Sequence, residues 1–376
     1  MKEMDKRLIG KWYKEEGETL NIFDETPLRM KMSFTSSGHY NFEPNCVYEK
    51  DGDLCFEIND ETYRMIYHVR FVEDHLEGYY TQFGKETPVR YSLVSHTPED
   101  KPYKHLPTEI YVPETEEKRI DLLKKYALYD KTHHESYETE YVLGGEAPSI
   151  LERYGFSEYV KGMDAESDDI VFKILDFVCD HFGHNGGVLL PSKRSIEDII
   201  VFCEKDDRKT NCRGLSILLA SLLRLYGIKA RHITCMPYED PFNDCHVVVD
   251  CLLPSGKRIM LDPSWRLFLK DSQGEYVSLE HLRNMLIAGE PVFPNSDASY
   301  NSFGEKENGQ PFDYDYYCNY MTKNTFRFSR GIYYADGSED SSVHRVELIP
   351  AGYPVEKFTE SDQKNFVYDD AAFWKL

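Results

Sequence analysis

One stretch of the chain, residues 210–227, constrains the fold more than any other. Five of its leucines recur at spacings of three and four: Leu215, Leu218, Leu219, Leu222 and Leu225. This spacing predicts a helix with one buried face. Asn211 or Thr210 is expected to cap the start of the helix, and Gly227 stands where a helix needs a left-handed residue to stop. The stretch therefore predicts a buried helix around which a domain is organised.

Cys212 falls in the first turn of this helix. Unpaired backbone N–H groups and the positive end of the helix dipole favour an anion there, and such a position lowers the pKa of a thiol. A lone cysteine on an apolar helix is usually just a small buried hydrophobe. The sequence that follows the helix is what favours a nucleophile in this chain.

Two apolar runs downstream predict a β-hairpin. His246 opens the run that ends at Leu253, residues 254–257 form a turn, and the second run, 258–261, leads into Asp262. His246 and Asp262 then lie near the open end of the hairpin, where side chains of adjacent strands meet. A cysteine, a histidine and an acid have the residue types of an activated nucleophile, its base and the group that orients the base.

The length of the hairpin turn decides whether His246 and Asp262 can meet. With a two-residue turn, Asp262 pairs with residue 249, whose side chain points to the opposite face from that of His246. A shift of one residue pairs Asp262 with residue 248, on the same face as His246, at a diagonal separation that the two side chains can bridge. We therefore predict a three-residue turn or a β-bulge between residues 246 and 262.

The sequence around these residues resembles the transglutaminase-like superfamily of papain-like thiol enzymes. The resemblance is carried by NCRGLS (211–216), LLRLYGIKAR (222–231), HVVV (246–249) and LDPSW (261–265). It covers roughly residues 165–270. It implies Cys212 as nucleophile, His246 as base and Asp262 as the residue that orients the histidine. The two valines after His246 depart from the family's pattern, in which a small residue and then an aromatic often follow.

The resemblance also suggests residues around the triad. In papain-like enzymes a polar side chain outside the nucleophile helix often assists the backbone N–H of the cysteine in holding the oxyanion, and Asn185 is the candidate here. The alternative for Asn185 is a helix-ending Asn-Gly-Gly turn. Tyr238 and Asp244, in the loop before His246, and Trp265 are candidate substrate contacts. A mobile loop with no specific role is the alternative for the first two.

The first part of the chain predicts a separate all-β domain. Residues 1–97 carry about eight short aromatic and β-branched runs separated by turns, which favours a meander that closes into a small barrel. The segment LIGKW (8–12) resembles the start of lipocalin-like barrels. Such a barrel can hold a small apolar ligand or be filled by its own side chains, and we expect a filled, accessory domain. Residues 98–113, punctuated by prolines, are expected to be a linker.

Residues 114–376 are expected to form the catalytic domain with a β-rich C-terminal extension. Apolar periodicity predicts further helices over 114–128, 168–182, 195–203 and 279–288. Aromatic runs predict strands over 314–320, 325–328 and 345–349. The predicted fold class is therefore α+β, with an antiparallel β-barrel-like domain followed by a papain-like transglutaminase-fold domain.

Composition limits the partners. Against 44 basic residues stand 66 acidic ones, and the formal net charge of −22 argues against a nucleic-acid partner. No run has the length of a membrane span, and the amino terminus lacks the apolar core of a signal peptide. Nine scattered cysteines without a Cys-x-x-Cys pair indicate a cytoplasmic protein with reduced thiols and no metal site. No cofactor is expected, and the oligomeric state is left open.

These features together predict thiol-dependent acyl transfer or hydrolysis at an amide bond of a peptide or protein substrate. We expect a peptidase, deamidase or amidase-type hydrolase ahead of a cross-linking enzyme. The main alternative is a catalytically inactive transglutaminase-fold protein that binds a ligand. A different acyl transfer, of the kind that arylamine acetyltransferases perform, is a further alternative.

Overall fold

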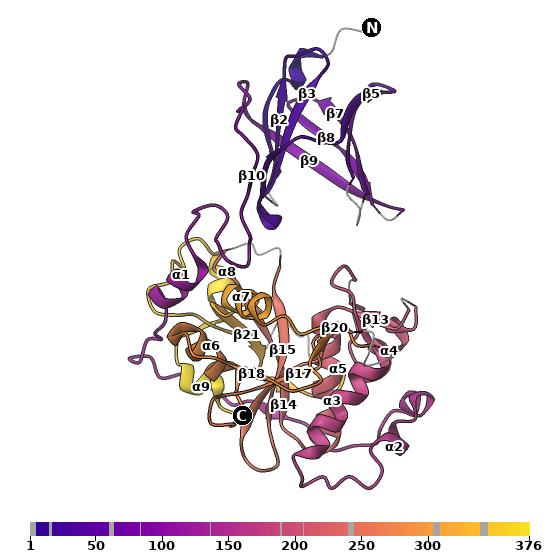
Figure 1. The fold of residues 1–376 in the computed structure, drawn as a ribbon, viewed down its shortest axis with the longest axis vertical. Coiled ribbons are helices and arrows are strands. Elements are labelled where there is room, and N and C mark those ends of the chain that lie inside the picture. Colours follow the sequence, from indigo (N-terminus) through magenta and orange to yellow (C-terminus); the bar gives the residue numbers. More distant parts are fainter. Residues whose placement is uncertain are drawn as a thin grey trace. The chain divides into compact units, whose positions relative to one another are not determined.

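The computed structural model describes residues 5–14, 17–59, 64–82, 84–135, 137–188, 190–205, 207–239, 244–303, 309–338 and 345–376. The chain divides into two compact units (Figure 1). The first consists of residues before Lys118, and the second contains the described residues from Lys118 to Leu376.

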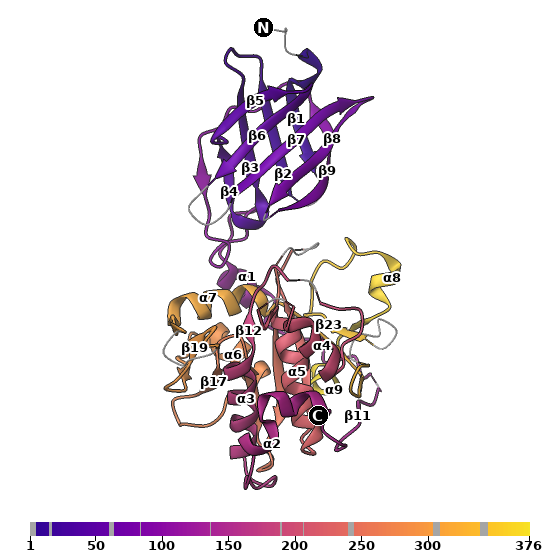
Figure 2. The same cartoon turned by 90° about the vertical axis from the view of Figure 1, so that its right-hand side faces the viewer.

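The described residues of the first unit form a ten-stranded antiparallel sheet that is strongly curled (Figures 1 and 2). Its strand order is β10-β4-β3-β2-β1-β9-β8-β7-β6-β5. The strands are β1 (Gly10–Lys14), β2 (Glu18–Phe23), β3 (Arg29–Phe34), β4 (His39–Phe42), β5 (Cys46–Lys50), β6 (Asp53–Asn59), β7 (Arg64–Val72), β8 (His75–Gln82), β9 (Lys85–Ser95) and β10 (Lys104–His105).

Side chains from one face of this sheet build the core of the first unit. Trp12 is fully buried, and its indole N–H donates to the carbonyl of Leu8 at 2.8 Å, so its polar atom is satisfied. Phe56 and Tyr67 stack with ring centroids 4.5 Å apart. The alternating pattern that predicted strands therefore reflects a single apolar cluster made by the sheet's own side chains.

The predicted closure of this sheet into a barrel is wrong for the described residues. The edge strands β5 and β10 do not pair with each other. Strand β4 pairs with β3 on one side and with β10 on the other, so it has no edge left for β5. Residues 99–105, expected within the linker, lie along the sheet, because Asp100 accepts from Arg29 at 2.8 Å and β10 pairs with β4. The domain boundaries stay a prediction.

The second unit is built on an eight-stranded sheet with the order β18-β17-β16-β15-β14-β21-β23-β24. Neighbouring strands are antiparallel except β23 and β24. The strands are β14 (Ala230–Met236), β15 (His246–Leu252), β16 (Arg258–Asp262), β17 (Leu267–Lys270), β18 (Phe293–Pro294), β21 (Arg327–Gly331), β23 (Arg345–Leu348) and β24 (Phe366–Val367).

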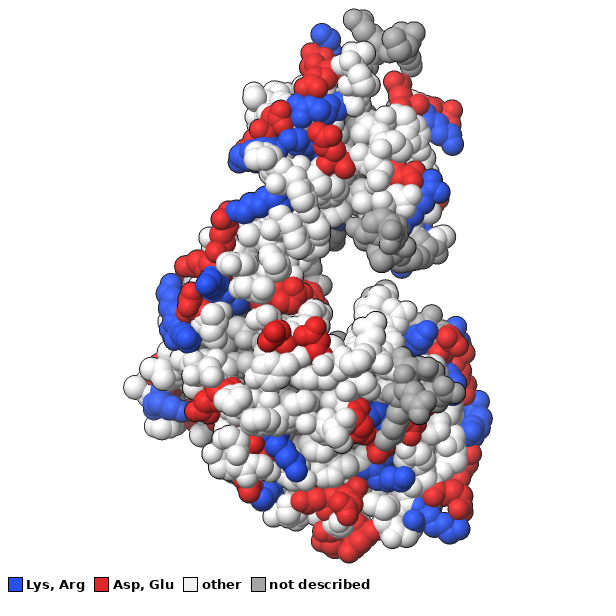
Figure 3. Space-filling model, in the orientation of Figure 1, with Lys and Arg blue, Asp and Glu red and all other residues white. Residues whose placement is uncertain are grey.

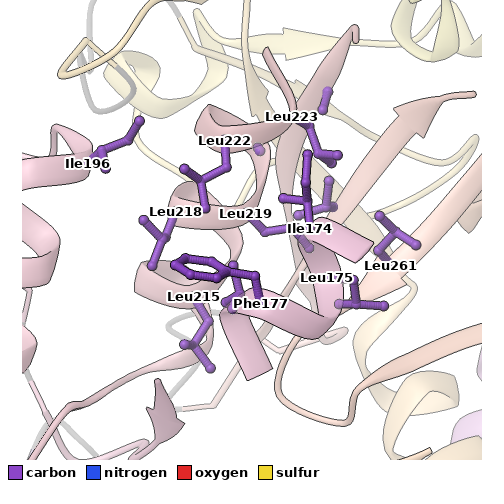
Figure 4. Packing of buried hydrophobic residues seen from close by; sticks show 14 of the residues in the cluster. Ile174, Leu175, Phe177, Ile196, Leu215, Leu218, Leu219, Leu222, Leu223 and Leu261 are labelled. Atoms are coloured by element: carbon purple, nitrogen blue, oxygen red, sulfur yellow. The ribbon is translucent and has the colours of Figure 1, made fainter. Parts of the chain in front are cut away.

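Helices cover both faces of this sheet. One apolar cluster contains α3 (Asp169–His181), α4 (Ile196–Cys203) and α5 (Cys212–Leu225) together with Val249 of β15. Figure 4 shows the leucines of α5 gathered with Ile174 and Phe177 of α3 in this cluster. A second cluster contains α6 (Leu279–Ala288), α7 (Tyr314–Asn324) and α9 (Asp370–Trp374) together with Val248. The adjacent valines of β15 thus enter different layers, as strand geometry requires.

Several short elements complete the second unit. They are α1 (Arg119–Lys125), α2 (Phe156–Tyr159), α8 (Glu360–Gln363) and the strand pairs β11 (Glu140–Tyr141) with β22 (Tyr333–Tyr334), β12 (Gly183–His184) with β13 (Lys209–Thr210), and β19 (Ser299–Tyr300) with β20 (Gln310–Pro311).

The helices predicted over 168–182, 195–203 and 279–288 are confirmed as α3, α4 and α6. The strand predicted over 314–320 is wrong, because these residues begin α7. Asp313 caps this helix by accepting the backbone N–H of Tyr316, and Tyr317 and Met321, four residues apart, bury one helix face. The extension is therefore mixed rather than β-rich. The helix predicted over 114–128 is shortened to α1, since Glu116 adopts a left-handed φ of 61°.

The surface of both units carries charges of both signs. On the face in Figure 3, acidic and basic side chains are interspersed around a broad uncharged region of the second unit. This pattern fits a solvated surface. Within the described ranges, no helix combines the length and the apolar character needed to cross a membrane.

Candidate active site

The start of α5 holds Cys212 in a fixed position. Asn211 caps the helix, as predicted: its side-chain oxygen accepts the Gly214 N–H at 3.0 Å, and its side-chain amide donates to the carbonyl of Val188 at 2.9 Å. One turn on, the Ser216 hydroxyl donates to the carbonyl of Val247 at 2.8 Å, which fastens the helix to β15. Cys212 is the first residue of this helix and is partly exposed.

A glycine at position 214 is required by this close packing. A Cβ added there would lie 2.3 Å from Oγ1 of Thr210 and 2.7 Å from a methyl group of Leu190. Both distances are shorter than non-bonded contacts allow, so a larger residue would displace the side chains of Thr210 and Leu190 beside the start of α5.

The register of the β15–β16 hairpin is the one predicted. Val249 pairs with Leu261, which places Asp262 opposite residue 248 and on the same face as His246. Leu253 and Lys257 close the hairpin through a backbone hydrogen bond of 2.8 Å, leaving three residues in the turn. The three-residue turn is therefore confirmed, and the two side chains meet: Nε2 of His246 lies 2.6 Å from Oδ2 of Asp262.

Buried charges tie the hairpin to its neighbouring strand. Asp250 of β15 accepts from Arg231 of β14 at 2.8 Å and from Arg258 of β16 at 3.1 Å, and Arg231 and Asp250 are fully buried. Removing one partner of such a network leaves an unpaired buried charge and costs about 3–5 kcal/mol. The network links three adjacent strands and so supports the register on which the His246–Asp262 contact depends.

Asp262 is fully buried and receives three hydrogen bonds. Besides His246, the hydroxyl of Tyr317 donates to Oδ2 at 3.1 Å, and the backbone N–H of Ser264 donates to Oδ1 at 3.0 Å. Tyr317 comes from α7, which was predicted to be a strand. These bonds fix the carboxylate in the orientation that faces the ring of His246.

Two histidines reach Cys212. Burial raises the pKa of the thiol, but hydrogen bonds from the side chains of His184 and His246 outweigh it and lower the pKa to about 6. For His246, burial lowers the pKa, whereas the Asp262 carboxylate and Cys212 raise it to about 10. Since Asp262 uses Nε2 of His246, the nitrogen left for Cys212 is Nδ1. The lowered pKa of the thiol and the raised pKa of the imidazole both favour a thiolate–imidazolium pair near neutral pH.

His184 was missed from the sequence as a site residue. It lies on β12, which pairs in parallel with β13 so that His184 stands opposite Thr210, two residues before Cys212. Its Nδ1 lies 2.7 Å from the hydroxyl of Tyr300, and its backbone is bonded to the side chain of Asn301. A sequence signal existed in the histidine directly before the predicted Asn-Gly-Gly turn, but nothing local shows that this segment pairs beside the nucleophile.

Asn185, the predicted oxyanion residue, is exposed, and its side-chain oxygen accepts the N–H of Gly187 at 3.1 Å. This is the turn-forming bond of the alternative interpretation. The side chain that reaches the thiol from this segment is that of the preceding residue, His184. An oxyanion role for Asn185 stays a prediction.

Trp265 lies behind the site. It is 6% exposed and packs its ring 4.9 Å from that of Tyr300 and 5.7 Å from that of Tyr317. These tyrosines bond His184 and Asp262, respectively. In the structure Trp265 therefore supports the residues around the thiol, and its predicted substrate contact stays untested.

Asp244 and Tyr238 are held by contacts within the second unit. Asp244 accepts from Lys323 at 2.6 Å and from the hydroxyl of Tyr320 at 3.2 Å, both on α7. Tyr238 packs in an aromatic group with centroid separations of 5.5–5.7 Å from Tyr126, Phe326 and Tyr353. Residues 240–243 of the same loop lie outside the described residues. The substrate contacts of this loop remain predictions.

No group of three or more His, Cys, Asp or Glu side chains is arranged to hold a metal ion in the part of the chain that the structure describes. The two histidines beside Cys212, His184 and His246, contact Cys212, Tyr300 and Asp262.

Alkylation by iodoacetamide should distinguish Cys212 from the other cysteines. Its pKa is lowered, so the thiolate is present above about pH 6 and is lost as the pH falls through that value. Burial raises the pKa of Cys245 to about 11 and that of Cys179 to about 12, so both should react slowly at neutral pH. Peptide mapping across pH 5–9 should show Cys212 modified first, with half-maximal rate near pH 6.

The exposed Cys46 of the first unit is the reference thiol for this measurement. Cys212 should react faster than Cys46 at pH 6.5 despite its lower exposure, and unfolding should remove the difference. A Cys212 rate that rises only above pH 8, where ordinary thiols ionise, would contradict the thiolate–imidazolium pair.

Comparison with known proteins finds one family model that matches part of the chain. Residues 155–263 match the model of the Transglutaminase-like superfamily, and this range contains Cys212, His246 and Asp262. No curated protein matches the chain.

Two solved structures are similar to the chain. One is a proposed cysteine protease from Cytophaga hutchinsonii, with 15% identity and a TM-score of 0.24 over 67% of this chain and 66% of that one. The other is a proposed protease from Parabacteroides distasonis, with 14% identity and a TM-score of 0.25 over 55% and 40%. The chain thus spans less than two thirds of either protein, and TM-scores this low establish no common fold.

Proposed function

We propose that the chain is a thiol enzyme acting at amide bonds of peptides or proteins, and the match of residues 155–263 to the Transglutaminase-like superfamily model supports this. One observation supports the proposal above all others. The thiol of Cys212, with its pKa lowered to about 6, is hydrogen-bonded by His246, whose other ring nitrogen lies 2.6 Å from the buried carboxylate of Asp262. This is the arrangement of a nucleophile, an acid–base group and its orienting acid.

The acylation step follows from these positions. The thiolate of Cys212 attacks the amide carbonyl carbon, a C–S bond forms, and the carbonyl π electrons move to the oxygen. As the C–N bond breaks, the His246 imidazolium gives its Nδ1 proton to the leaving amine. A histidine with its pKa raised to about 10 keeps that proton at neutral pH. Asp262 holds the ring on Nε2 and stabilises its charge.

The thioester then reacts with a second nucleophile. Neutral His246 takes a proton from water, which gives hydrolysis, or from an amine, which gives transamidation. We propose hydrolysis as the main fate. Access of water to the thioester decides between the two outcomes, and both use the same three residues.

A substrate screen tests this function. Wild type and Cys212→Ala should be compared on peptides, on glutaminyl amides with ammonia release as readout, and on acyl donors offered with a labelled amine. Activity in wild type that is absent from Cys212→Ala and retained in Cys46→Ala, which removes an exposed thiol of the first unit, is the expected result. Equal inactivity of wild type and Cys212→Ala on all three classes would favour the ligand-binding alternative.

A further inference from the structure

Both the backbone and the side chain of His184 are fixed close to Cys212. The β12–β13 pairing brings it opposite Thr210, two residues before Cys212. The side-chain amide of Asn301 clamps its backbone on both sides: Oδ1 accepts the His184 N–H at 2.9 Å, and Nδ2 donates to the His184 carbonyl at 3.2 Å. A residue fixed in this way at a reacting atom has the rigidity that a catalytic group needs.

The hydrogen bonds of His184 define which ring nitrogen carries its proton. Nδ1 lies 2.7 Å from the hydroxyl of Tyr300, so Nε2 is the nitrogen that faces the sulfur of Cys212. A thiolate accepts hydrogen bonds, and Nε2 must therefore carry a proton. Burial raises the pKa of Tyr300, which keeps its hydroxyl protonated and able to donate to Nδ1. His184 is therefore an Nε2–H donor to the sulfur of Cys212.

The proton transfers of the proposed reaction do not require His184. His246 already supplies the proton that the leaving amine needs, and His184 is held by Tyr300 and Asn301 rather than by a carboxylate. An N–H beside the attacking sulfur is instead placed to bond the carbonyl oxygen when negative charge develops on it. The backbone N–H of Cys212, the first residue of α5, has no carbonyl within its own helix to bond and points to the same end.

We infer that His184 is a catalytic residue that donates Nε2–H to the oxyanion of the tetrahedral intermediate, with Tyr300 as the positioning residue that sets its tautomer. The inference rests on the proposed thiol chemistry. When the C–S bond forms, the charge leaves sulfur for the former carbonyl oxygen, and the hydrogen bond of His184 moves with it. No proton is transferred by His184, and the C=O bond is restored as the leaving group departs.

Two reactions of the Cys212 sulfur can distinguish stabilisation of the oxyanion by His184 from stabilisation of the thiolate by the same residue. Acylation by p-nitrophenyl acetate passes through an oxyanion, whereas alkylation by iodoacetamide does not. Both rates are measured on Cys212 at the pH plateau of each variant, so that differences in thiolate fraction cancel. The ratio of acylation to alkylation is then the readout.

His184→Ala should lower this ratio by about 10²-fold, the usual effect of removing one oxyanion donor. His184→Gln, whose amide can also donate, should recover part of the loss, and Tyr300→Phe should lower the ratio by less than His184→Ala. His246→Ala is the matched control, because it removes the other histidine at the same sulfur; the nitrophenolate leaves without a proton, so the ratio should change little.

A ratio unchanged in both His184→Ala and Tyr300→Phe, with folding verified by near-ultraviolet circular dichroism, overturns the inference. Acylation and alkylation that fall in parallel overturn it too, since His184 would then serve the thiolate alone. The ester reaction needs no natural substrate. A wild type that cleaves no amide but shows the expected ratios would refute the proposed function and leave the role of His184 intact.

Discussion

Replacement of Cys212 by alanine should abolish turnover and leave the second unit folded. The sulfur is the attacking atom, and without it the remaining groups can only bind and polarise the substrate. We expect a loss of more than about 10⁴-fold in kcat. The side chain is partly exposed in the first turn of α5, so its removal creates little cavity, and the free energy of unfolding should change by about 1 kcal/mol or less.

Initial rates on the best substrate from the screen, with thermal unfolding of the same samples, measure both quantities. Cys46→Ala removes an exposed thiol from the first unit and should keep the wild-type rate. Wild-type turnover in the Cys212 variant would assign the chemistry to another group, whereas a large fall in Tm would mean that the rate loss reports unfolding.

The second large loss of kcat is expected when His246 or Asp262 is replaced, and the loss should be larger for His246. His246→Ala removes both the proton donor and the main cationic partner of the thiolate, so kcat should fall by about 10³-fold or more. Asp262→Asn keeps the side-chain volume but loses the charge that stabilises the imidazolium, and a fall of about 10²-fold is expected. In this variant the pH at which the alkylation rate of Cys212 is half-maximal, near 6 in the wild type, should also move to a higher value.

Tyr317→Phe is a control with a smaller expected loss of kcat than either His246→Ala or Asp262→Asn. It removes one of the three hydrogen bonds to Asp262 while the bond to His246 remains, so its effect on kcat should be smaller than that of Asp262→Asn. A larger loss for Asp262→Asn than for His246→Ala, with both variants folded, would contradict the role of Asp262 as an orienting group.

The parts of the site that local sequence encodes were predictable. The leucine spacing and Asn211 define α5, and counting pairs along the hairpin shows that only a register shifted by one residue from a two-residue turn brings His246 to Asp262. Both follow from rules that act over a few residues.

The remaining site residues are defined by long-range packing, which no local pattern contains. His184 lies on a two-residue strand whose partner is β13, and Tyr300 and Asn301 meet it from more than a hundred residues away. Tyr317 was assigned to a strand, because aromatic residues favour strands in general, whereas the Asp313 cap and burial against the sheet make α7. In the first unit, closure of the sheet into a barrel was wrongly predicted, because strand patterns do not show that β10 occupies the edge of β4.

The sequence separations within the site bear on when a newly made chain becomes reactive. His246 and Asp262 are 16 residues apart, but Asp262 and Tyr317 are 55 apart, and His184 and Asn301 are 117 apart. Contacts that close long loops carry the largest entropic cost, and chains rich in them fold slowly. In refolding, helical signal from α5 should therefore return before a fast-reacting thiol does. A partly folded chain would then carry its nucleophile in an inert state, harmless to the proteins around it.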